Sequence, residues 1–356
     1  MRYTISFLLA SLTAGAAAAE VPRVVTDIPP VHSLVAQVMG DLGAPELLLD
    51  RGADAHDFQM RPSQAAALAG AGLVVWMGPG MTPWLSRALD GTGTGAARLT
   101  LLEAEGTHLQ AFGASGEAHD HDDHGHDHAH DHAGHGHGHT GKADAHDHAH
   151  EDHAHGDHAH DDHAHDDNAH DDHAHGDHAH DHSGTDPHAW LDPHNAEVWL
   201  GLIAAELGRL DPTNAATCAA NAGAAAGAIE ALEEELAAIL APVKDRPFVT
   251  FHDAYGYFAG HFGLTQAGSI ALGDAASPGA ARLSDLRAQL GGGGAFCVFP
   301  EANHDARLSA QLAEATGTRL GPVLDPEGSS LEPGPGLYAD LMRGLAQGLA
   351  ECLASS

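Results

Sequence analysis

The sequence predicts an α/β protein of two lobes, each with a parallel sheet flanked by helices, joined by a long helix. Three observations lead to this fold class. Short apolar runs alternate with helical patterns, which is typical of parallel sheets covered by helices. The alternation occurs in two sets along the chain. A stretch of strong helix formers separates the two sets and predicts one long connecting helix.

The first set of elements lies before a segment rich in histidine. The expected strands are Arg23–Thr26, Glu46–Leu49, Leu73–Trp76 and Leu99–Leu102, and the expected helices are Pro30–Met39, Pro62–Ala69 and Pro83–Leu89. Pro62-Ser63 followed by alanine-rich sequence is typical of a helix start. Because strands and helices alternate, we expect the strands to be parallel.

The second set follows the connecting stretch. The expected strands are Phe248–Phe251, Leu264–Ile270, Ala295–Phe299 and Arg319–Val323, and the expected helices are Tyr255–Phe262, Pro278–Leu290, Arg307–Ala315 and Tyr338–Leu353. The connecting helix is predicted over Asn214–Leu240, after Asp211-Pro212 and before Pro242. Two lobes joined by one long helix predict a cleft between them and limited hinge freedom.

The N-terminus predicts export. Residues 1–19 combine Met1-Arg2, a short apolar stretch and small residues ending in Ala17-Ala18-Ala19, the pattern of a secretory signal peptide. The stretch is too short for a transmembrane helix, so we expect a periplasmic protein. Beyond it the predicted organisation is an N-terminal lobe over 20–114 and 186–212, a His/Asp-rich loop over 115–185, a linker helix over 213–242 and a C-terminal lobe over 243–356.

The His/Asp-rich loop dominates the composition. Between His119 and His182 it holds 25 of the 33 histidines, and its only aliphatic side chains are alanine. Such a segment cannot build a core and is expected to be a disordered, exposed loop. The formal net charge of the chain is −35, and roughly half of it lies in this loop. That charge argues against nucleic acid or anionic lipid as partners.

Outside the loop, three histidines stand where a ligand site is expected. His56 follows the strand Glu46–Leu49 and His252 follows Phe248–Phe251, and ligands of α/β sheets bind beyond the carboxyl ends of strands. His188 lies between two prolines as the chain leaves the loop, and Asp325 ends the last expected strand. Three imidazoles with a carboxylate or water form the four-coordinate shell that Zn²⁺ prefers. Asp253, next to His252, is a candidate helix cap or supporting carboxylate.

Four ordered motifs carry a family resemblance: GADAHDFQMRPSQ, DPHAWLDP, FHDAYGYF and LGPVLDPEG, with the acidic His-rich insertion before DPHAW. Over about 24–353 the chain resembles the zinc solute-binding proteins of ABC transporters, the ZnuA-like cluster A-I group. The resemblance implies two four-stranded lobes, a rigid linker helix and a metal held between the lobes. It carries over His56, His188 and His252 as ligands, with Asp325 or water in the fourth position.

The resemblance has further implications. It favours Zn²⁺ over Mn²⁺, since manganese members are expected to have a carboxylate where His252 stands. It implies a disulfide between Cys297 and Cys352, leaving Cys218 without an assigned role. One departure is Ala55, where some zinc members carry an acidic residue. The implied function is non-enzymatic: capture of Zn²⁺ by a monomer and delivery to a membrane ABC permease.

Two alternative functions stay open at this point. Three histidines and a water also describe a catalytic zinc site, so a zinc hydrolase is conceivable, although no motif supplies a separate general base. The loop alone would suit a periplasmic zinc store.

The other five histidines are expected to be structural or surface groups: His32 in a supporting role, His261 near a helix C-terminus, and His108, His194 and His304 at the surface.

Overall fold

The structure is a computed structural model that describes residues 21–92, 94–112, 184–272 and 278–355. The predicted signal peptide and nearly all of the predicted His/Asp-rich loop lie outside the described residues. No helix in the described ranges is both long enough and apolar enough to cross a membrane.

The N-terminal sheet contains the four predicted strands, all parallel, in the order β2-β1-β3-β4. The strands are β1 Val24–Thr26, β2 Glu46–Leu47, β3 Leu73–Trp76 and β4 Ala97–Thr100. β3 lies inside the sheet and is buried at all four positions, as its unbroken apolar run requires. The helices between these strands are α1 Pro29–Met39, α2 Pro62–Ala69 and α3 Pro83–Thr92, each beginning at or next to a proline.

The C-terminal sheet repeats this plan in the order β6-β5-β7-β8, again all parallel. Its strands are β5 Phe248–Thr250, β6 Gln266–Ser269, β7 Cys297–Val298 and β8 Arg319–Leu320, and its helices are α6 Gly256–Phe262, α7 Ala280–Leu290, α8 Ala306–Thr316 and α9 Leu337–Leu353. The prediction of two four-stranded parallel sheets is confirmed.

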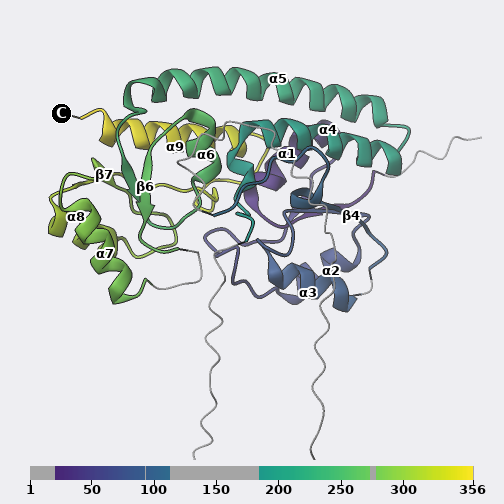
Figure 1. Ribbon diagram of the computed structural model, residues 1–356. Coiled ribbons are helices and arrows are strands. Elements are labelled where there is room, and N and C mark those ends of the chain that lie inside the picture. Colours follow the sequence, from purple (N-terminus) through teal and green to yellow (C-terminus); the bar gives the residue numbers. More distant parts are fainter. Residues whose placement is uncertain (1–20, 93, 113–183, 273–277, 356) are drawn as a thin grey trace, which may run out of the picture. The chain divides into compact units, whose positions relative to one another are not determined.

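The linker helix α5 runs from Ala215 to Leu240 and packs against α4, α9 and α1 (Figure 1). Its buried side chains recur three or four residues apart and form one face: Cys218, Ala222, Ala225, Ile229, Leu232, Leu236 and Leu240. This spacing is that of an amphipathic helix lying on a core. Because α5 contacts helices of both halves along its length, it can hold them as one body.

Six of the eight strands are shorter than expected, and two other elements also differ. β4 begins at Ala97 rather than Leu99, and Leu101 already starts a short 3-10 helix, so the apolar run Leu99–Leu102 straddles the strand end. The helix α4, Pro193–Leu210, is not among the expected helices. Its first turn is capped by Asp192, whose carboxylate accepts from the His194 backbone N–H.

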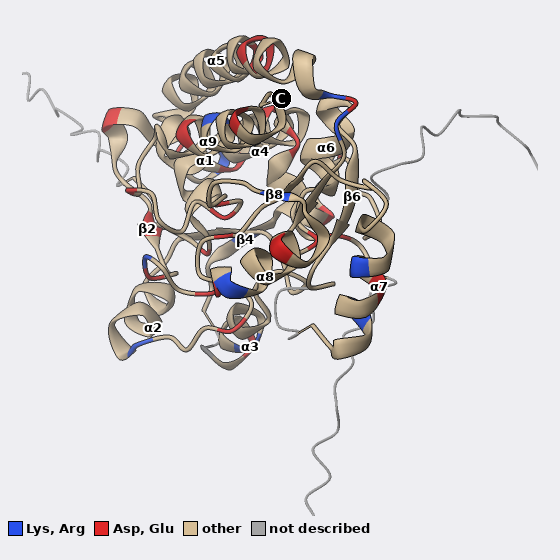
Figure 2. Cartoon of the chain, turned by 90° about the vertical axis from the view of Figure 1, so that its left-hand side faces the viewer, with Lys and Arg blue, Asp and Glu red and all other residues tan. Residues whose placement is uncertain are grey.

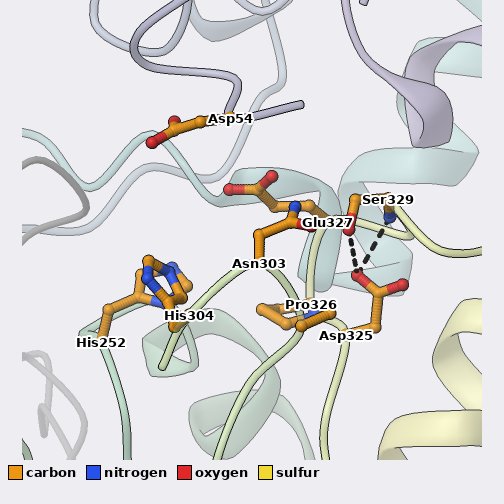
Figure 3. Close-up of a pocket in the computed structure, with 9 residues that line it drawn as sticks. Asp54, His252, Asn303, His304, Asp325, Pro326, Glu327 and Ser329 are labelled. Carbon is orange, nitrogen blue, oxygen red and sulfur yellow. Dashed lines mark hydrogen bonds between the residues drawn. The ribbon is translucent and has the colours of Figure 1, made fainter. Parts of the chain in front are cut away.

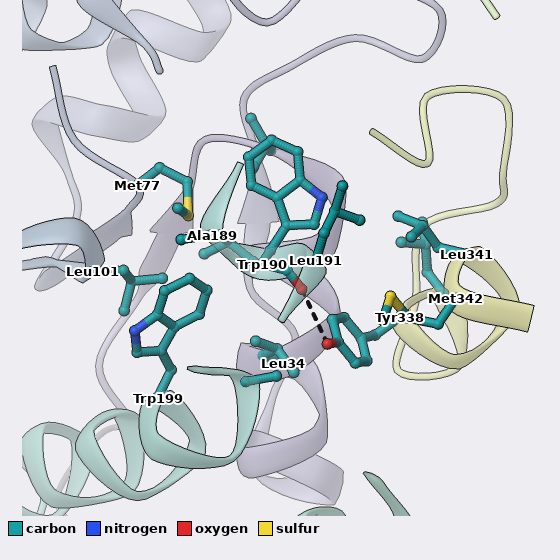
Figure 4. Close-up of a cluster of buried hydrophobic side chains, with 14 of the residues drawn as sticks. Leu34, Met77, Leu101, Ala189, Trp190, Leu191, Trp199, Tyr338, Leu341 and Met342 are labelled. Carbon is teal, nitrogen blue, oxygen red and sulfur yellow. Dashed lines mark hydrogen bonds between the residues drawn. The ribbon is translucent and has the colours of Figure 1, made fainter. Parts of the chain in front are cut away.

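A buried aromatic group connects the two halves of the described chain. Trp190 is fully buried, and its indole Nε1 donates to the carbonyl of Pro326 over 2.9 Å. The carbonyl of Trp190 in turn accepts from the hydroxyl of Tyr338 on α9 over 3.0 Å (Figure 4). These are hydrogen bonds between segments far apart in sequence, and they fix the His188-Ala189-Trp190 segment against the C-terminal half.

The implied disulfide is present. Cys297 on β7 is bonded to Cys352 in the last turn of α9, closing a sequence separation of 55 residues. Both half-cystines are buried, as is the free thiol of Cys218. The bond ties the C-terminal helix to an inner strand of the C-terminal sheet.

His261, in the last turn of α6, joins three elements through two carboxylates. Its Nδ1 lies 3.0 Å from Asp192 at the start of α4, and its Nε2 contacts Glu233 on α5, which carries several acidic positions (Figure 2). Burial acts to lower the pKa of His261, but the hydrogen bonds and charges of Asp192 and Glu233 outweigh it and raise the pKa above 6.5. Protonation of His261 therefore strengthens its link from the C-terminal half to α4 and α5.

This link predicts a pH-dependent stability. A raised pKa means that the contribution of His261 is complete below its unfolded pKa of about 6.5 and is lost as pH rises through the folded value. We expect the His261→Gln protein to be less stable than wild type at pH 6, with a smaller difference at pH 9. Urea unfolding at the two pH values checks this. A difference independent of pH would show that the charge of His261 contributes nothing.

Candidate metal centre

His56 is positioned by the turn that follows β2. The backbone N–H of His56 donates to Oδ1 of Asp54 over 2.8 Å, which closes a turn of the kind that Asp side chains favour. On the other side of the turn, Nε1 of Trp84 donates to the carbonyl of Ala55 over 2.7 Å. Ala55 is fully buried, so the position that is acidic in some zinc proteins is here packed into the core.

His188 is fully buried and is oriented by Asp186. Oδ1 of Asp186 accepts from the backbone N–H of His188 over 3.0 Å and from its Nδ1 over 2.7 Å. Asp186 is itself held by Tyr257, whose hydroxyl donates to the Asp186 carbonyl over 3.0 Å. Gly256 lies close by: a Cβ there would lie 3.2 Å from Oδ2 of Asp186 and 2.3 Å from Nε2 of Gln110, so the Gln110 side chain would have to shift.

His252 follows β5 and is oriented by Glu301 in the same manner. Oε1 of Glu301 accepts from the backbone N–H groups of Phe251 and His252 over 3.0 and 3.2 Å. Oε2 of Glu301 accepts a short hydrogen bond from Nδ1 of His252. His252 is 1% exposed and Glu301 2% exposed, so the pair is removed from water. Asp253 was expected to support His252 or cap α6. The residue before α6 is Tyr255, without a side-chain cap, so Asp253 does not cap this helix.

The two carboxylates fix which ring nitrogen faces the site. An ionised carboxylate can only accept, so Nδ1 carries the proton in both His188 and His252 and Nε2 keeps its lone pair. All three Nε2 atoms of His56, His188 and His252 are buried. This arrangement of imidazole and supporting carboxylate is the one that orients histidines toward a metal.

The structure brings the three predicted histidines together. The ring centroid of His188 lies 5.9 Å from that of His56 and 5.3 Å from that of His252. Imidazoles bound to one tetrahedral zinc ion at about 2.0–2.1 Å have centroids roughly 5 Å apart. Both centroid distances from His188 are therefore close to those expected for ligands of one zinc ion.

Asp325 lines a small cavity with His252, but its carboxylate faces its own turn (Figure 3). Oδ1 accepts from the N–H and hydroxyl of Ser329 over 3.0 and 3.2 Å, and Oδ2 from those of Ser330 over 2.8 and 2.5 Å. Binding a metal directly requires Asp325 to give up part of this network.

His304 lies elsewhere than expected. It was predicted at the surface, but it is half-buried, stacks on Phe251 at 4.3 Å between centroids and lies 5.5 Å from the ring of His252. The surface assignment of His304 is therefore wrong. The run Glu301-Ala302-Asn303-His304 follows a strand end, the same signal that singled out His252, so strand-end position was enough to nominate it.

The remaining histidines have roles away from this centre. His32 donates from Nε2 to the Pro45 carbonyl over 3.2 Å, and burial lowers the pKa of its imidazole. His194 is exposed. The side chain of His108 is 56% exposed while Nδ1 lies 2.8 Å from Asp192. Sequence reasoning missed Asp186 and Glu301 as supporting carboxylates, although both lie within three residues of a predicted ligand or strand end.

Comparison with known proteins places this geometry in a family. Residues 24–352 match the family model described as zinc-uptake complex component A, periplasmic. This match covers most of the chain. The chain belongs to that family.

Relatives of the zinc-uptake component A family agree over nearly the full length. The chain is 52% identical over 337 residues to the high-affinity zinc uptake system protein ZnuA of Paracoccus denitrificans, covering 95% of this chain and 93% of that protein. It is 39% identical to the protein of the same name from Brucella abortus, covering 99% and 97%. A crystal structure of a zinc-bound ZnuA deletion mutant has the same fold, with a TM-score of 0.66 at 21% identity, covering 94% of this chain and 99% of that chain.

Proposed function

We propose that this protein captures Zn²⁺ in the periplasm through His56, His188 and His252 and delivers it to a membrane ABC permease for import. Membership of the zinc-uptake component A family supports the zinc cargo and the periplasmic setting. The observation that carries the residue assignment is the pair of buried carboxylates, Asp186 and Glu301, each bonded to Nδ1 of a predicted ligand. They leave Nε2 of both rings for the ion.

The proposed ligand set suits zinc as a cargo. Neutral imidazoles are borderline ligands, which favour Zn²⁺ over Mn²⁺, an ion that prefers oxygen. The ion must bind tightly enough to be captured and still leave for the permease. Since His56 and His188 lie before the linker helix and His252 after it, the proposed site takes ligands from both halves. The protein acts here as a solute-binding component, with the ion transferred unchanged.

Water is the fourth ligand that we propose, with Asp325 in a supporting position. Its four accepted hydrogen bonds give Asp325 a structural role at the turn after β8. We expect Asp325→Asn to weaken zinc binding by less than about tenfold, the lower limit of what loss of a supporting group typically costs. Competition against a zinc chelator measures this. A loss as large as that of a histidine variant would identify Asp325 as a ligand.

Deleting residues 117–183 separates transport from storage. Our proposal expects one tight zinc site to remain, because His56, His188 and His252 lie outside that segment; a store would lose essentially all bound zinc. We propose that the segment acts as a low-affinity collector that raises the zinc concentration near the site. Zinc uptake by cells making the deleted chain and its permease, under chelation, checks both ideas. Unaffected uptake would remove the collector, and loss of the tight site would favour storage.

A further inference from the structure

His304 occupies a prepared position beside the three-histidine centre. It lies in the turn between β7 and α8, directly after Asn303, whose backbone φ of 66° is in the left-handed region. Asn tolerates this conformation better than most residues, at some conformational cost. The turn presents the imidazole of His304 to the ring of Phe251, with an interplanar angle of 19°. Stacking and backbone together fix the ring next to His252.

His304 completes a group with metal-ligand geometry. One donor atom each from His252, Glu301 and His304 lie within 4.8 Å of one another, and His252 and Glu301 are buried. The centroid distance of 5.5 Å between His252 and His304 matches the 5.3 Å between His188 and His252. Two imidazoles and a carboxylate are a ligand set that zinc accepts, with water in the open position.

A small polar cavity adjoins this group. Its volume is about 10 Å³, room for a single water or ion, and its lining includes His252, His304, Asp54, Asp325 and Glu327 (Figure 3). The carboxylates add negative charge around the two imidazoles. A cavity of this size and lining favours one small cation over any organic ligand.

We propose that His252, Glu301 and His304 form a second zinc position, held by the C-terminal half alone and sharing His252 with the three-histidine site. Glu301 faces Nδ1 of His252, so an ion held by both residues takes the lone pair of Nδ1, and the ring proton moves from Nδ1 to Nε2. A neutral imidazole offers one lone pair, because its other nitrogen keeps the proton. His252 therefore serves one ion at a time, and the two positions are alternatives for the same ion rather than sites filled together.

The second position changes how the ion leaves. In the three-histidine site the ion has ligands from both halves, whereas every ligand of the second position lies after the linker helix. An ion that shifts to His304 and Glu301 stays bound to the C-terminal half after releasing His56 and His188. This inference rests on the proposed function, since it assigns a step to the same cargo, but it concerns different residues.

A crystallographic experiment on the full chain tests the second position. In the His56→Ala/His188→Ala variant, soaked with zinc, we expect an anomalous peak at the zinc edge between His252, Glu301 and His304. Adding His304→Phe, which retains a ring to stack on Phe251, is expected to abolish that peak. No peak in the double variant, or a peak unchanged by His304→Phe, would overturn the proposal.

Chelator competition gives the matching solution result. In the double variant, His304→Phe is expected to weaken the residual tightest zinc affinity at least about tenfold, whereas the exposed His194→Ala leaves it unchanged. An equal response to both substitutions contradicts the second position. A different result would contradict the proposed function: zinc-soaked wild-type crystals without an anomalous peak among His56, His188 and His252.

Discussion

Replacing His188 with alanine is expected to weaken tight zinc binding by orders of magnitude. His188 is one of the three proposed ligands, and the ring centroids of His56 and His252 both lie within 6 Å of its own. It is fully buried. Removing only its support is expected to cost less: Asp186→Ala leaves the ligand atom but frees the ring, and such changes cost about 10–100-fold in metal affinity.

Competition against chelators of graded affinity measures this series. The zinc affinity is expected to be lowest for His188→Ala and intermediate for Asp186→Ala. That of His194→Ala is expected to equal wild type, since His194 is exposed and outside the centre. Circular dichroism on each variant checks that it has folded. Wild-type affinity in folded His188→Ala protein would refute the assignment of the three histidines.

Loss of the disulfide is the second large effect. Replacing both Cys297 and Cys352 with serine is expected to lower the free energy of unfolding by about 4 kcal/mol, from the chain entropy released by opening a loop of 55 residues. Thermal unfolding of wild type and variant measures it. Because the bond joins β7 to α9 and contributes no ligand, zinc affinity of the folded variant is expected to match wild type.

The control for this experiment uses the third cysteine. Cys218 is buried on α5 and has no disulfide partner, so Cys218→Ala removes a thiol without opening a loop. Its effect on stability is expected to be well below that of the double serine variant. Wild-type protein treated with a phosphine reductant should behave like the double variant. Equal melting temperatures with and without reductant would show that the bond adds no stability.

The fold was predictable because its signals are local. β3 is a continuous apolar run, α2 starts at a proline and ends before a glycine, and the one-sided apolar face of α5 repeats along 26 residues. The strand ends were less predictable. In the C-terminal sheet, β7 and β8 have two residues each, although the strands predicted there, Ala295–Phe299 and Arg319–Val323, are five residues long. Pairing with neighbouring strands, not residue type, decides where such a run leaves the sheet.

The candidate site could be predicted only at residues whose type is unusual for their position in the sequence. His56, His188 and His252 stand out because histidine at a strand end or between prolines is unusual. Glu301 does not stand out, because a glutamate after a strand is usually a surface residue. Its hydrogen bond with His252 joins residues 49 positions apart in the sequence. His304 also follows a strand end, but its contact with Phe251 could not be predicted because the two residues are distant in sequence. Contacts between separate loops decide which residues lie at the site, and the spacing of residues within one loop does not predict these contacts.

The ends of the His/Asp-rich insertion are joined to each other beside His188. Ala111 pairs with Thr185 in an antiparallel bridge, and Asp186 donates its backbone N–H to the Gln110 carbonyl over 2.9 Å. A segment whose two ends are already fastened together can lengthen, shorten or change composition without pulling on the structure beneath it. We therefore expect changes in the length or histidine content of the insertion to leave Asp186 and His188 in place.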